Sequence, residues 1–186
     1  MFHPALFKGA NVVVTGAGRG IGLEIAHRLE ALKLEIGYHT RNPRGDVSYR
    51  YYGSLREMAE AVDILLCIVP KTPETHKAID ADILAALGPQ GVLINVGRGW
   101  SVDEAALVAA LENGTIAGAG LDVFENEPSV NPKLLKLAAE GKVVLLPHMS
   151  SATLEGRVDM GEKVVINIRT FFDGHRPPDR VLPSRV

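Results

Sequence analysis

Three side chains that can bind an anion or transfer a proton each follow the end of an apolar run. Arg98 follows the run at 92–95, Glu127 follows the run at 116–123, and His148 follows the run at 143–146. The carboxyl ends of parallel strands meet at one edge of a sheet, so these side chains are expected to converge there. An arginine, a carboxylate and an imidazole together suit proton transfer beside an anionic substrate. Taken singly, they also fit a surface cation, a loop charge and a polar residue at a helix start.

A glycine-rich turn follows the first apolar run and leads directly into an amphipathic segment. Glycines let a backbone approach a pyrophosphate, and the N–H groups at a helix N-terminus meet its negative charge. The turn therefore predicts a dinucleotide site, although a tight connection without a ligand is the alternative. The residues predicted to hold the cofactor here are Gly16, Gly18, Arg19, Gly20, Ile21 and Gly22.

The segment after the second apolar run indicates which dinucleotide is bound. An NAD site usually carries an acidic residue at this strand end, to bond the ribose 2′-OH. The chain has Thr40, Arg41 and Arg44 there and no acidic residue at the strand end. Guanidinium groups bind phosphate strongly, so the pattern favours NADP(H), with NAD as the alternative if both arginines are solvated loop residues.

Short aliphatic runs alternate with longer amphipathic segments, which is typical of repeated βα units. The expected strands are residues 11–15, 34–39, 63–69, 92–95, 116–123 and 143–146, and the expected helices are 21–32, 54–61, 80–87, 103–112, 133–140 and 154–172. Capping boxes are predicted at Ser54 with Glu57 and at Ser101 with Glu104. The sequence predicts one doubly wound, Rossmann-type α/β domain over residues 1–173 and a proline-rich arm over 174–186.

Composition limits the partners of the chain. Its 186 residues are 46% hydrophobic and carry a formal net charge of -2, which suits a globular protein without general attraction to nucleic acid or an anionic membrane. No secretory signal is recognised at the N-terminus, so a cytoplasmic location is expected. The single Cys67 lies within an apolar run and is expected to be buried, and the histidines show no metal-ligand spacing.

Several longer motifs point to one family. They are Val69-Pro70 with Thr72-Pro73-Glu74-Thr75, then Ile94 to Gly99 with Val102-Asp103-Glu104, then Gly118 to Pro128, and finally Pro147-His148 with Ser151-Ala152-Thr153. In this order they resemble the NAD(P)-binding domain of D-isomer-specific 2-hydroxyacid dehydrogenases, and most closely the glyoxylate and hydroxypyruvate reductase branch. The resemblance covers residues from about 9 to 172.

The resemblance implies a role for each site residue. Arg98 would hold the carboxylate of a small 2-oxo acid, His148 would give the proton to its carbonyl oxygen, and Glu127 would pair with His148. A carboxylate partner favours the imidazolium form, so it would keep His148 protonated and able to give a proton. The resemblance also adds to the cofactor site Val69, Pro70, Thr75, Val96, Asp122 and Ser151. It further implies a homodimer.

Two departures from the family pattern leave a second function open. The family's substrate-binding domain is not recognised in this chain, so little turnover is expected from it alone. The alternative is an isolated or engineered dinucleotide-binding module without turnover. The glycine turn is also one residue longer than the family form and resembles that of short-chain dehydrogenases. Those enzymes need a Tyr-x-x-x-Lys pair, which the chain lacks. Lys71 and Trp100 stand where apolar or small residues are usual.

Overall fold

The computed structural model describes residues 11–15 and 20–180, and the chain divides into two compact units, residues 1–147 and 148–186. The first unit holds the sheet and five of the described α-helices, and the second holds α6, Leu154–Phe172, and the segment that follows it. The expected dinucleotide-binding domain over residues 1–173 and the arm over 174–186 stay predictions. None of the described helices is both long enough and apolar enough to cross a bilayer.

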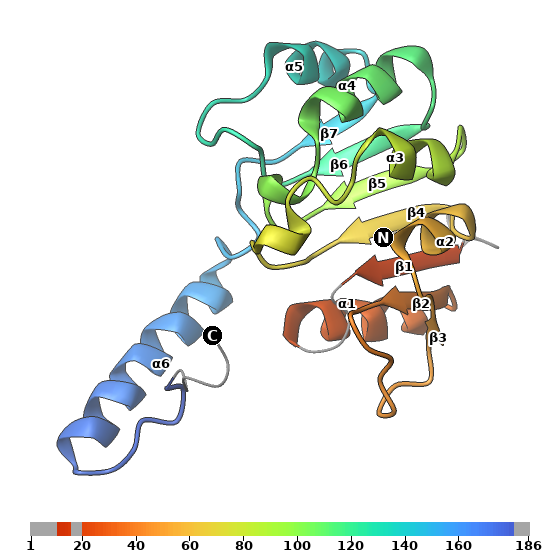
Figure 1. Ribbon diagram of the computed structural model, residues 1–186. Helices are drawn as coiled ribbons and strands as arrows, with labels where there is room; N and C mark the ends of the chain where they lie inside the picture. Colours follow the sequence, from red (N-terminus) through yellow and green to blue (C-terminus); the bar gives the residue numbers. More distant parts are fainter. Residues whose placement is uncertain (1–10, 16–19, 181–186) are drawn as a thin grey trace. The chain divides into compact units, whose positions relative to one another are not determined.

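The first unit is built on one parallel sheet of seven strands, in the order β3-β2-β1-β4-β5-β6-β7 (Figure 1). The strands are β1 Asn11–Thr15, β2 Glu35–His39, β3 Arg50–Tyr51, β4 Ile64–Cys67, β5 Val92–Asn95, β6 Gly118–Leu121 and β7 Val143–Leu145. The order reverses between β1 and β4, where doubly wound folds bind their ligands. The predicted Rossmann-type fold is confirmed.

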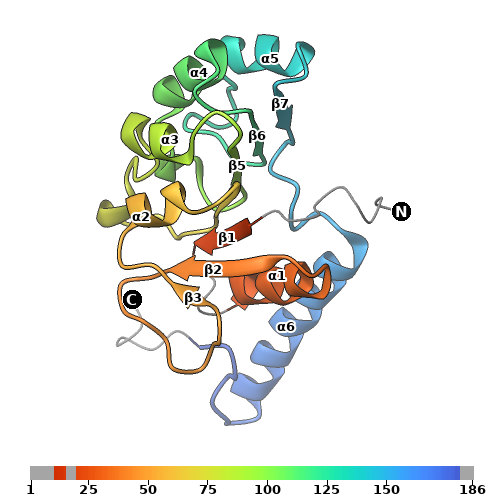
Figure 2. The ribbon, with the colours of Figure 1, turned by 90° about the vertical axis from the view of Figure 1, so that its right-hand side faces the viewer.

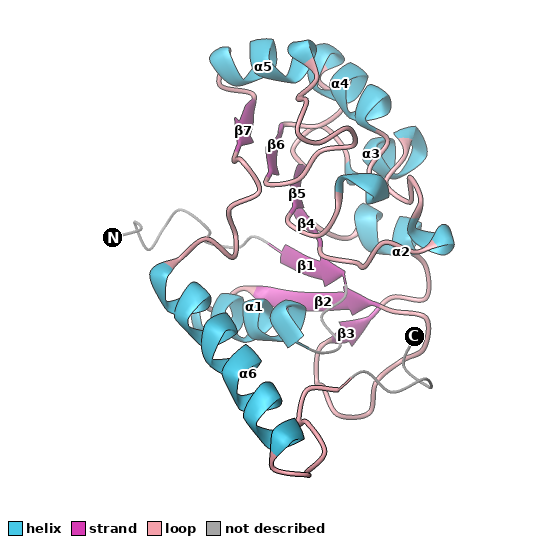
Figure 3. Cartoon of the chain, turned by 90° about the vertical axis from the view of Figure 1, so that its left-hand side faces the viewer, coloured by secondary structure: helices cyan, strands magenta, loops and turns pink. Residues whose placement is uncertain are grey.

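Helices cover both faces of this sheet. They are α1 Gly20–Ala31, α2 Leu55–Glu60, α3 Ala81–Leu87, α4 Glu104–Asn113 and α5 Pro132–Ala139. In Figure 3, α2 to α5 lie along one face, and α1 lies on the other. Figure 2 shows α1 alongside β1 and β2, which it contacts. Two short 3₁₀ helices, η1 Pro73–Thr75 and η2 Gly99–Ser101, interrupt the loops after β4 and β5.

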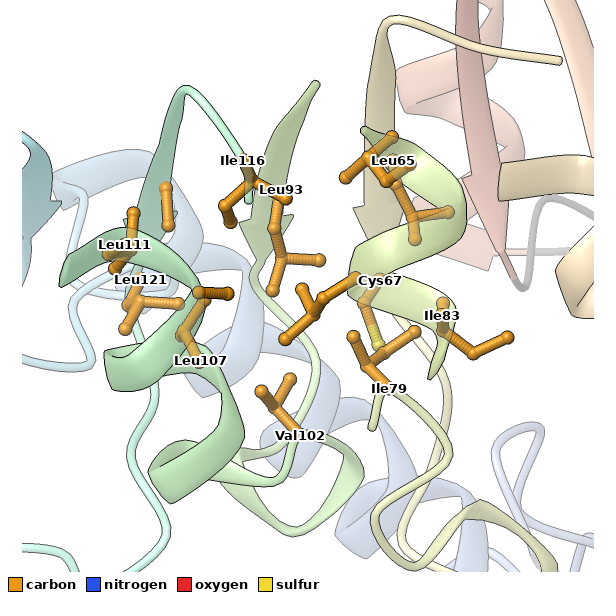
Figure 4. Close-up of a cluster of buried hydrophobic side chains, with 14 of the residues drawn as sticks. Leu65, Cys67, Ile79, Ile83, Leu93, Val102, Leu107, Leu111, Ile116 and Leu121 are labelled. Carbon is orange, nitrogen blue, oxygen red and sulfur yellow. The ribbon is translucent and has the colours of Figure 1, made fainter. Parts of the chain in front are cut away.

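Two hydrophobic clusters hold the helices on the sheet. The larger one lies between the central strands and α2 to α5. Figure 4 shows Leu65, Leu93 and Leu107 among its side chains, each fully buried. The smaller one joins α1 to β1 and β2. Cys67 belongs to the larger cluster with 1% of its surface exposed, so its predicted burial is confirmed. Strands covered on both faces lose polar alternation, which explains their unbroken apolar runs.

One strand escaped prediction, and the strands β2, β4, β6 and β7 are shorter than expected. β3 has only two residues, paired as Gly37 with Arg50 and Tyr38 with Tyr51, and it lies at the edge of the sheet. A two-residue strand leaves no apolar run for sequence to reveal. β6 spans Gly118–Leu121, although the apolar run extends over 116–123, because pairing with β5 covers only these four residues.

The predicted cap of α4 was wrong. Its N-cap is Asp103, whose carboxylate accepts the N–H groups of Ala105 and Ala106, each at 3.1 Å. Ser101 belongs to η2, where its buried hydroxyl has no hydrogen-bond partner among the described residues. At α2, the Ser54 hydroxyl accepts the Glu57 N–H at 3.1 Å as predicted, whereas the Glu57 carboxylate accepts the N–H of the residue before the cap.

Candidate active site

The loops after β4, β5 and β6 leave the sheet at the same edge, because the three strands end in register. Cys67 pairs with Asn95, and Asn95 pairs with Leu121. The first loop residues extend the ladder: the Val96 N–H donates to the Cys67 carbonyl at 3.1 Å, and the Asp122 N–H donates to the Asn95 carbonyl at 3.0 Å. The predicted residues Val96 and Asp122 therefore lie side by side at the carboxyl edge.

Asn95 shapes the turn that carries Arg98. Its side chain is 1% exposed, its Oδ1 accepts the Gly97 N–H at 3.1 Å, and its Nδ2 donates to the Arg98 carbonyl at 3.0 Å. The Arg98 side chain is exposed, and its Nη1 donates to the Gly97 carbonyl at 2.6 Å. Sequence reasoning gave Asn95 no role, although an amide two residues before a glycine is a recognised turn signal.

Two glycines let these loops pack backbone against backbone. A Cβ at Gly97 would lie 3.0 Å from the Ile68 Cα and from the Val69 carbonyl oxygen. A Cβ at Gly99 would lie 2.0 Å from the carbonyl carbon and oxygen of Phe124. The loop that carries Arg98 is therefore held closely between the loops after β4 and β6, and neither glycine position has room for a side chain.

The loop after β6 is held by carboxylates. Glu127 is exposed, and its Oε1 accepts the Phe124 N–H at 2.8 Å, which closes the turn between them. The buried Glu104 of α4 reaches back to the same loop, where its Oε2 accepts the Glu125 N–H at 3.0 Å. Asp122 is 2% exposed. These contacts bring Asp122, Glu127 and the Arg98 loop to one region of the edge.

The loop after β4 contains the predicted residues Val69, Pro70 and Thr75. The Thr75 hydroxyl donates to the Pro70 carbonyl at 2.8 Å and accepts the Thr72 N–H at 2.9 Å, so it closes the turn of η1. Val69 is half-buried against Gly97, and Pro70 is exposed. The hydroxyl of Thr75 thus gives this loop its shape.

Trp100 and Lys77 tie the same loop to its neighbours. The Trp100 indole donates to the Thr72 carbonyl at 2.9 Å, its ring centre lies 4.1 Å from that of His76, and the Lys71 ammonium lies 4.4 Å above it. The Lys77 ammonium lies 3.3 Å from both Asp103 and Glu125. Hydrogen bonding to Asp103, and then to Glu125, raises the pKa of Lys77. The three loops therefore form one connected scaffold.

The predicted phosphate-binding residues follow β2. Thr40 is half-buried, and its hydroxyl donates to the Asn42 carbonyl at 2.7 Å. Arg41 is exposed. The Arg44 guanidinium makes a two-pronged ion pair with Asp46, with its Nε donating to Oδ1 at 2.8 Å and its Nη2 donating to Oδ2. Sequence reasoning missed this engagement of Arg44.

The glycine turn is described only at its end. Gly16, Gly18 and Arg19 lie outside the described residues, whereas Gly20, Ile21 and Gly22 form the first turn of α1. Ile21 is 72% exposed, and Gly22 is buried. β1 pairs with both β2 and β4, so α1 begins at the point where the strand order reverses. A helix N-terminus at this point fits the pyrophosphate of a dinucleotide.

Two predicted residues belong to the second unit. His148 is exposed and has a φ of 51°, and Ser151 is exposed and precedes α6. The expected pair between Glu127 and His148, and the role of Ser151, stay predictions. Within the described part of the chain, no group of His, Cys, Asp and Glu side chains is arranged to hold a metal ion.

Comparison with known proteins identifies the family of the chain. Residues 2–150 match the family described as D-isomer specific 2-hydroxyacid dehydrogenase, NAD binding domain. The chain is 57% identical to a NADPH-dependent glyoxylate/hydroxypyruvate reductase from Sinorhizobium meliloti, whose crystal structure contains NADP and malonate. The TM-score is 0.83, over 89% of this chain and 50% of that one.

Two plant proteins are also similar. The chain is 49% identical over 168 residues to hydroxyphenylpyruvate reductase of Plectranthus scutellarioides, and 45% identical over 168 residues to glyoxylate/hydroxypyruvate reductase A of Arabidopsis thaliana. Each match covers 90% of this chain and 52% of the relative, so the chain spans about half the length of these proteins. The chain belongs to the D-isomer specific 2-hydroxyacid dehydrogenase family, and most of it is the family's NAD-binding domain.

Proposed function

We propose that the chain is the cofactor-binding part of an NAD(P)H-dependent reductase, which converts a small 2-oxo acid of the glyoxylate or hydroxypyruvate type into the D-2-hydroxy acid. The observation that carries the proposal is the packing of Gly99 against the Phe124 backbone, which joins the loop of Arg98 to the turn that Glu127 closes. Arg98 can bind the carboxylate of the substrate, and Glu127 can pair with a histidine. The two loops that carry them are therefore held together at this edge of the sheet.

Each residue has a defined task in this reaction. Arg98 binds the substrate carboxylate through its guanidinium, and Asp122 orients the nicotinamide carboxamide. His148, as the imidazolium that Glu127 pairs with, donates its proton to the carbonyl oxygen as C2 of the substrate is reduced. When bound, the nicotinamide cofactor supplies the hydride, which balances the proton that His148 gives.

The cofactor contacts extend along the same edge. The pyrophosphate would lie on the turn from Gly16 to Gly22 at the start of α1. The arginines after β2 would meet a 2′-phosphate, and the Sinorhizobium meliloti relative, which is NADPH-dependent, supports NADPH as the favoured cofactor. The remaining contacts would come from Thr40, Val69, Pro70, Thr75, Val96 and Ser151.

Binding is the first test. Calorimetric titration of the purified chain with NADPH and, in parallel, with NADH is expected to give binding of both and tighter binding of NADPH. A chain shown to be folded by circular dichroism that binds neither dinucleotide would contradict the proposal. Turnover with glyoxylate is then followed by the loss of NADPH absorbance.

Two substitutions test the assigned roles in a turnover assay with glyoxylate and NADPH. His148→Asn removes the proton donor and is expected to lower kcat by about 10²- to 10⁴-fold while leaving NADPH affinity nearly unchanged. Arg98→Ala is expected to act mainly on kcat/KM for glyoxylate. His175→Asn, at an exposed histidine of the C-terminal segment, is the matched control. Retained turnover in His148→Asn would remove His148 from the acid role.

A homodimer in the cytoplasm completes the proposal. The support for the dimer is the family resemblance. Sedimentation equilibrium is expected to give twice the mass of the chain, and a monomer at micromolar concentration would contradict the dimer.

A further inference from the structure

A buried carboxylate outside the predicted site reaches the loop after β6. Glu104 is the first residue of α4, and it is 8% exposed. Its Oε2 accepts the N–H of Glu125 at 3.0 Å, although the two residues are 21 positions apart in the chain. Asp103 caps the helix, so Glu104 is not needed for that task. A buried carboxylate is costly unless it is hydrogen-bonded, so the position of Glu104 is coupled to that of the Glu125 N–H.

Glu125 is the residue at which this loop leaves the core. Residues 121–124 are buried, whereas residues 125–129 are exposed. The Oε1 atom of Glu125 lies 3.3 Å from the Lys77 ammonium. Glu125 is therefore held at its backbone by Glu104 and at its side chain by Lys77.

Residues with proposed tasks lie close to this point in the fold. A Cβ at Gly99 would lie 2.5 Å from the Glu125 nitrogen, so the loop that carries Arg98 packs directly against it. Asp122 lies three residues before Glu125, and its N–H donates to the Asn95 carbonyl at 3.0 Å. The buried segment from Asp122 to Glu125 is thus fixed at both ends. A shift of the Glu125 backbone would be passed to Asp122 at one side and to the Arg98 loop at the other.

We propose that Glu104 is a positioning residue for the nicotinamide end of the cofactor site. It acts by holding the Glu125 N–H, and through it the position of Asp122. This inference rests on the proposed dinucleotide-binding function, in which Asp122 orients the nicotinamide carboxamide. The hydrogen bond needs an acceptor oxygen at the right distance, so the reach of the side chain matters more than its charge.

The test compares two ligands by calorimetric titration of the purified chain. One is NADPH, and the other is 2′-phospho-ADP-ribose, which has the same adenosine, 2′-phosphate and pyrophosphate but no nicotinamide. Glu104→Ala is expected to weaken NADPH binding about five- to tenfold and 2′-phospho-ADP-ribose binding less than about twofold, because the Glu125 N–H loses its acceptor. A merely structural role would weaken the binding of both ligands alike. Circular dichroism checks that each variant is folded.

Two milder variants separate reach from charge. Glu104→Gln retains an acceptor oxygen at the same reach and is expected to keep the NADPH affinity within about twofold of the wild type. Glu104→Asp retains the charge but is shorter by one methylene group, so it should weaken NADPH binding as Glu104→Ala does. An aspartate in the first turn favours a helix, so this variant tests the proposal even if Glu104→Ala does not fold. Glu112→Ala is the matched control, because it removes from the same helix an exposed carboxylate that lies 3.3 Å from Lys133, and it should change neither affinity.

The outcomes separate this inference from the function on which it rests. A folded wild-type chain that binds neither ligand overturns both. A wild type that binds NADPH no more tightly than 2′-phospho-ADP-ribose overturns the inference alone, because the nicotinamide then adds no contact for Glu104 to set. Equal losses for the two ligands in Glu104→Ala also overturn it, as does full NADPH affinity in Glu104→Asp with a loss in Glu104→Gln. In these last cases the proposed function stands.

Discussion

Single residues in this site act mainly by fixing the backbone. Asn95 uses both ends of its amide to hold the turn before Arg98, and Thr75 closes the turn of η1 with one hydroxyl. A buried amide that satisfies two backbone groups costs far more to lose than its net contribution suggests, because both groups would be left unpaired. The exposed arginine thus owes its position to side chains that do no chemistry.

Gly99 offers the sharpest test at this scale. A Cβ there would lie 2.0 Å from backbone atoms of Phe124, so Gly99→Ala must displace the loop after β6. We expect it to lower the free energy of unfolding by about 3 kcal/mol, measured by urea denaturation. Gly45→Ala is the control, because a Cβ at Gly45 meets nothing within 4 Å, and it should change stability by less than about 0.5 kcal/mol. Equal effects of the two substitutions would show that the close approach at Gly99 is not tight.

At the scale of elements, helix starts are tied to the site loops. Asp103 caps α4 and also pairs with Lys77, which follows η1. Its pKa is lowered, first by hydrogen bonding to the Ala106 N–H and then by Lys77. One carboxylate therefore joins a helix N-terminus to the neighbouring loop, and two elements depend on its charge.

Asp103 predicts a pH dependence of stability. Because its pKa in the folded chain is below the usual 3.8, its contribution is complete above that value and disappears as the pH falls through the folded pKa. Asp103→Asn keeps a capping oxygen and is expected to cost about 1 kcal/mol at pH 7 in urea unfolding. The difference from wild type should shrink steadily below pH 3.8.

Asp80→Asn is the control for this substitution. Asp80 caps α3 in the same way, and among the described ion pairs none involves it. It should therefore cost less than Asp103→Asn at pH 7. A difference between Asp103→Asn and wild type that stays constant from neutral to acidic pH would contradict the role of its charge.

For the whole molecule, the hydrophobic core lies within the first unit. The buried side chains of both clusters come from residues 12–143, and no residue of α6 is buried. The first unit also holds every strand of the described sheet. A compact unit with its own core is expected to fold independently.

Truncation tests this expectation. A chain ending at Pro147 should unfold in urea as one cooperative transition, with a free energy of unfolding within about 1 kcal/mol of the full chain. Far-ultraviolet circular dichroism, corrected for the missing α6, measures it. Loss of the cooperative transition would show that residues 148–186 are needed for the core.

Sequence alone determined the fold class and the residues that follow the strands, because these depend on local periodicity and on motifs within one βα unit. Unbroken apolar runs placed six of the seven strands, and the motifs around Arg98 and Asp122 placed the loops of the site. The two-residue strand β3 escaped because so short a pairing leaves no pattern.

Only the tertiary structure determined which partner each of these side chains binds. Several contacts depend on which side chains come together when the chain folds. They are the paired hydrogen bonds from Arg44 to Asp46, the hydrogen bond between Glu104 and the loop after β6, and the packing of Trp100 on His76 and Lys71. Ser101 and Glu104 matched a capping box in sequence, yet Asp103 took the cap and released Glu104 to hold a loop 21 residues away. Which residue caps a helix depends on the other partners that lie close to each side chain in the folded protein. The spacing of residues along the chain does not reveal these partners.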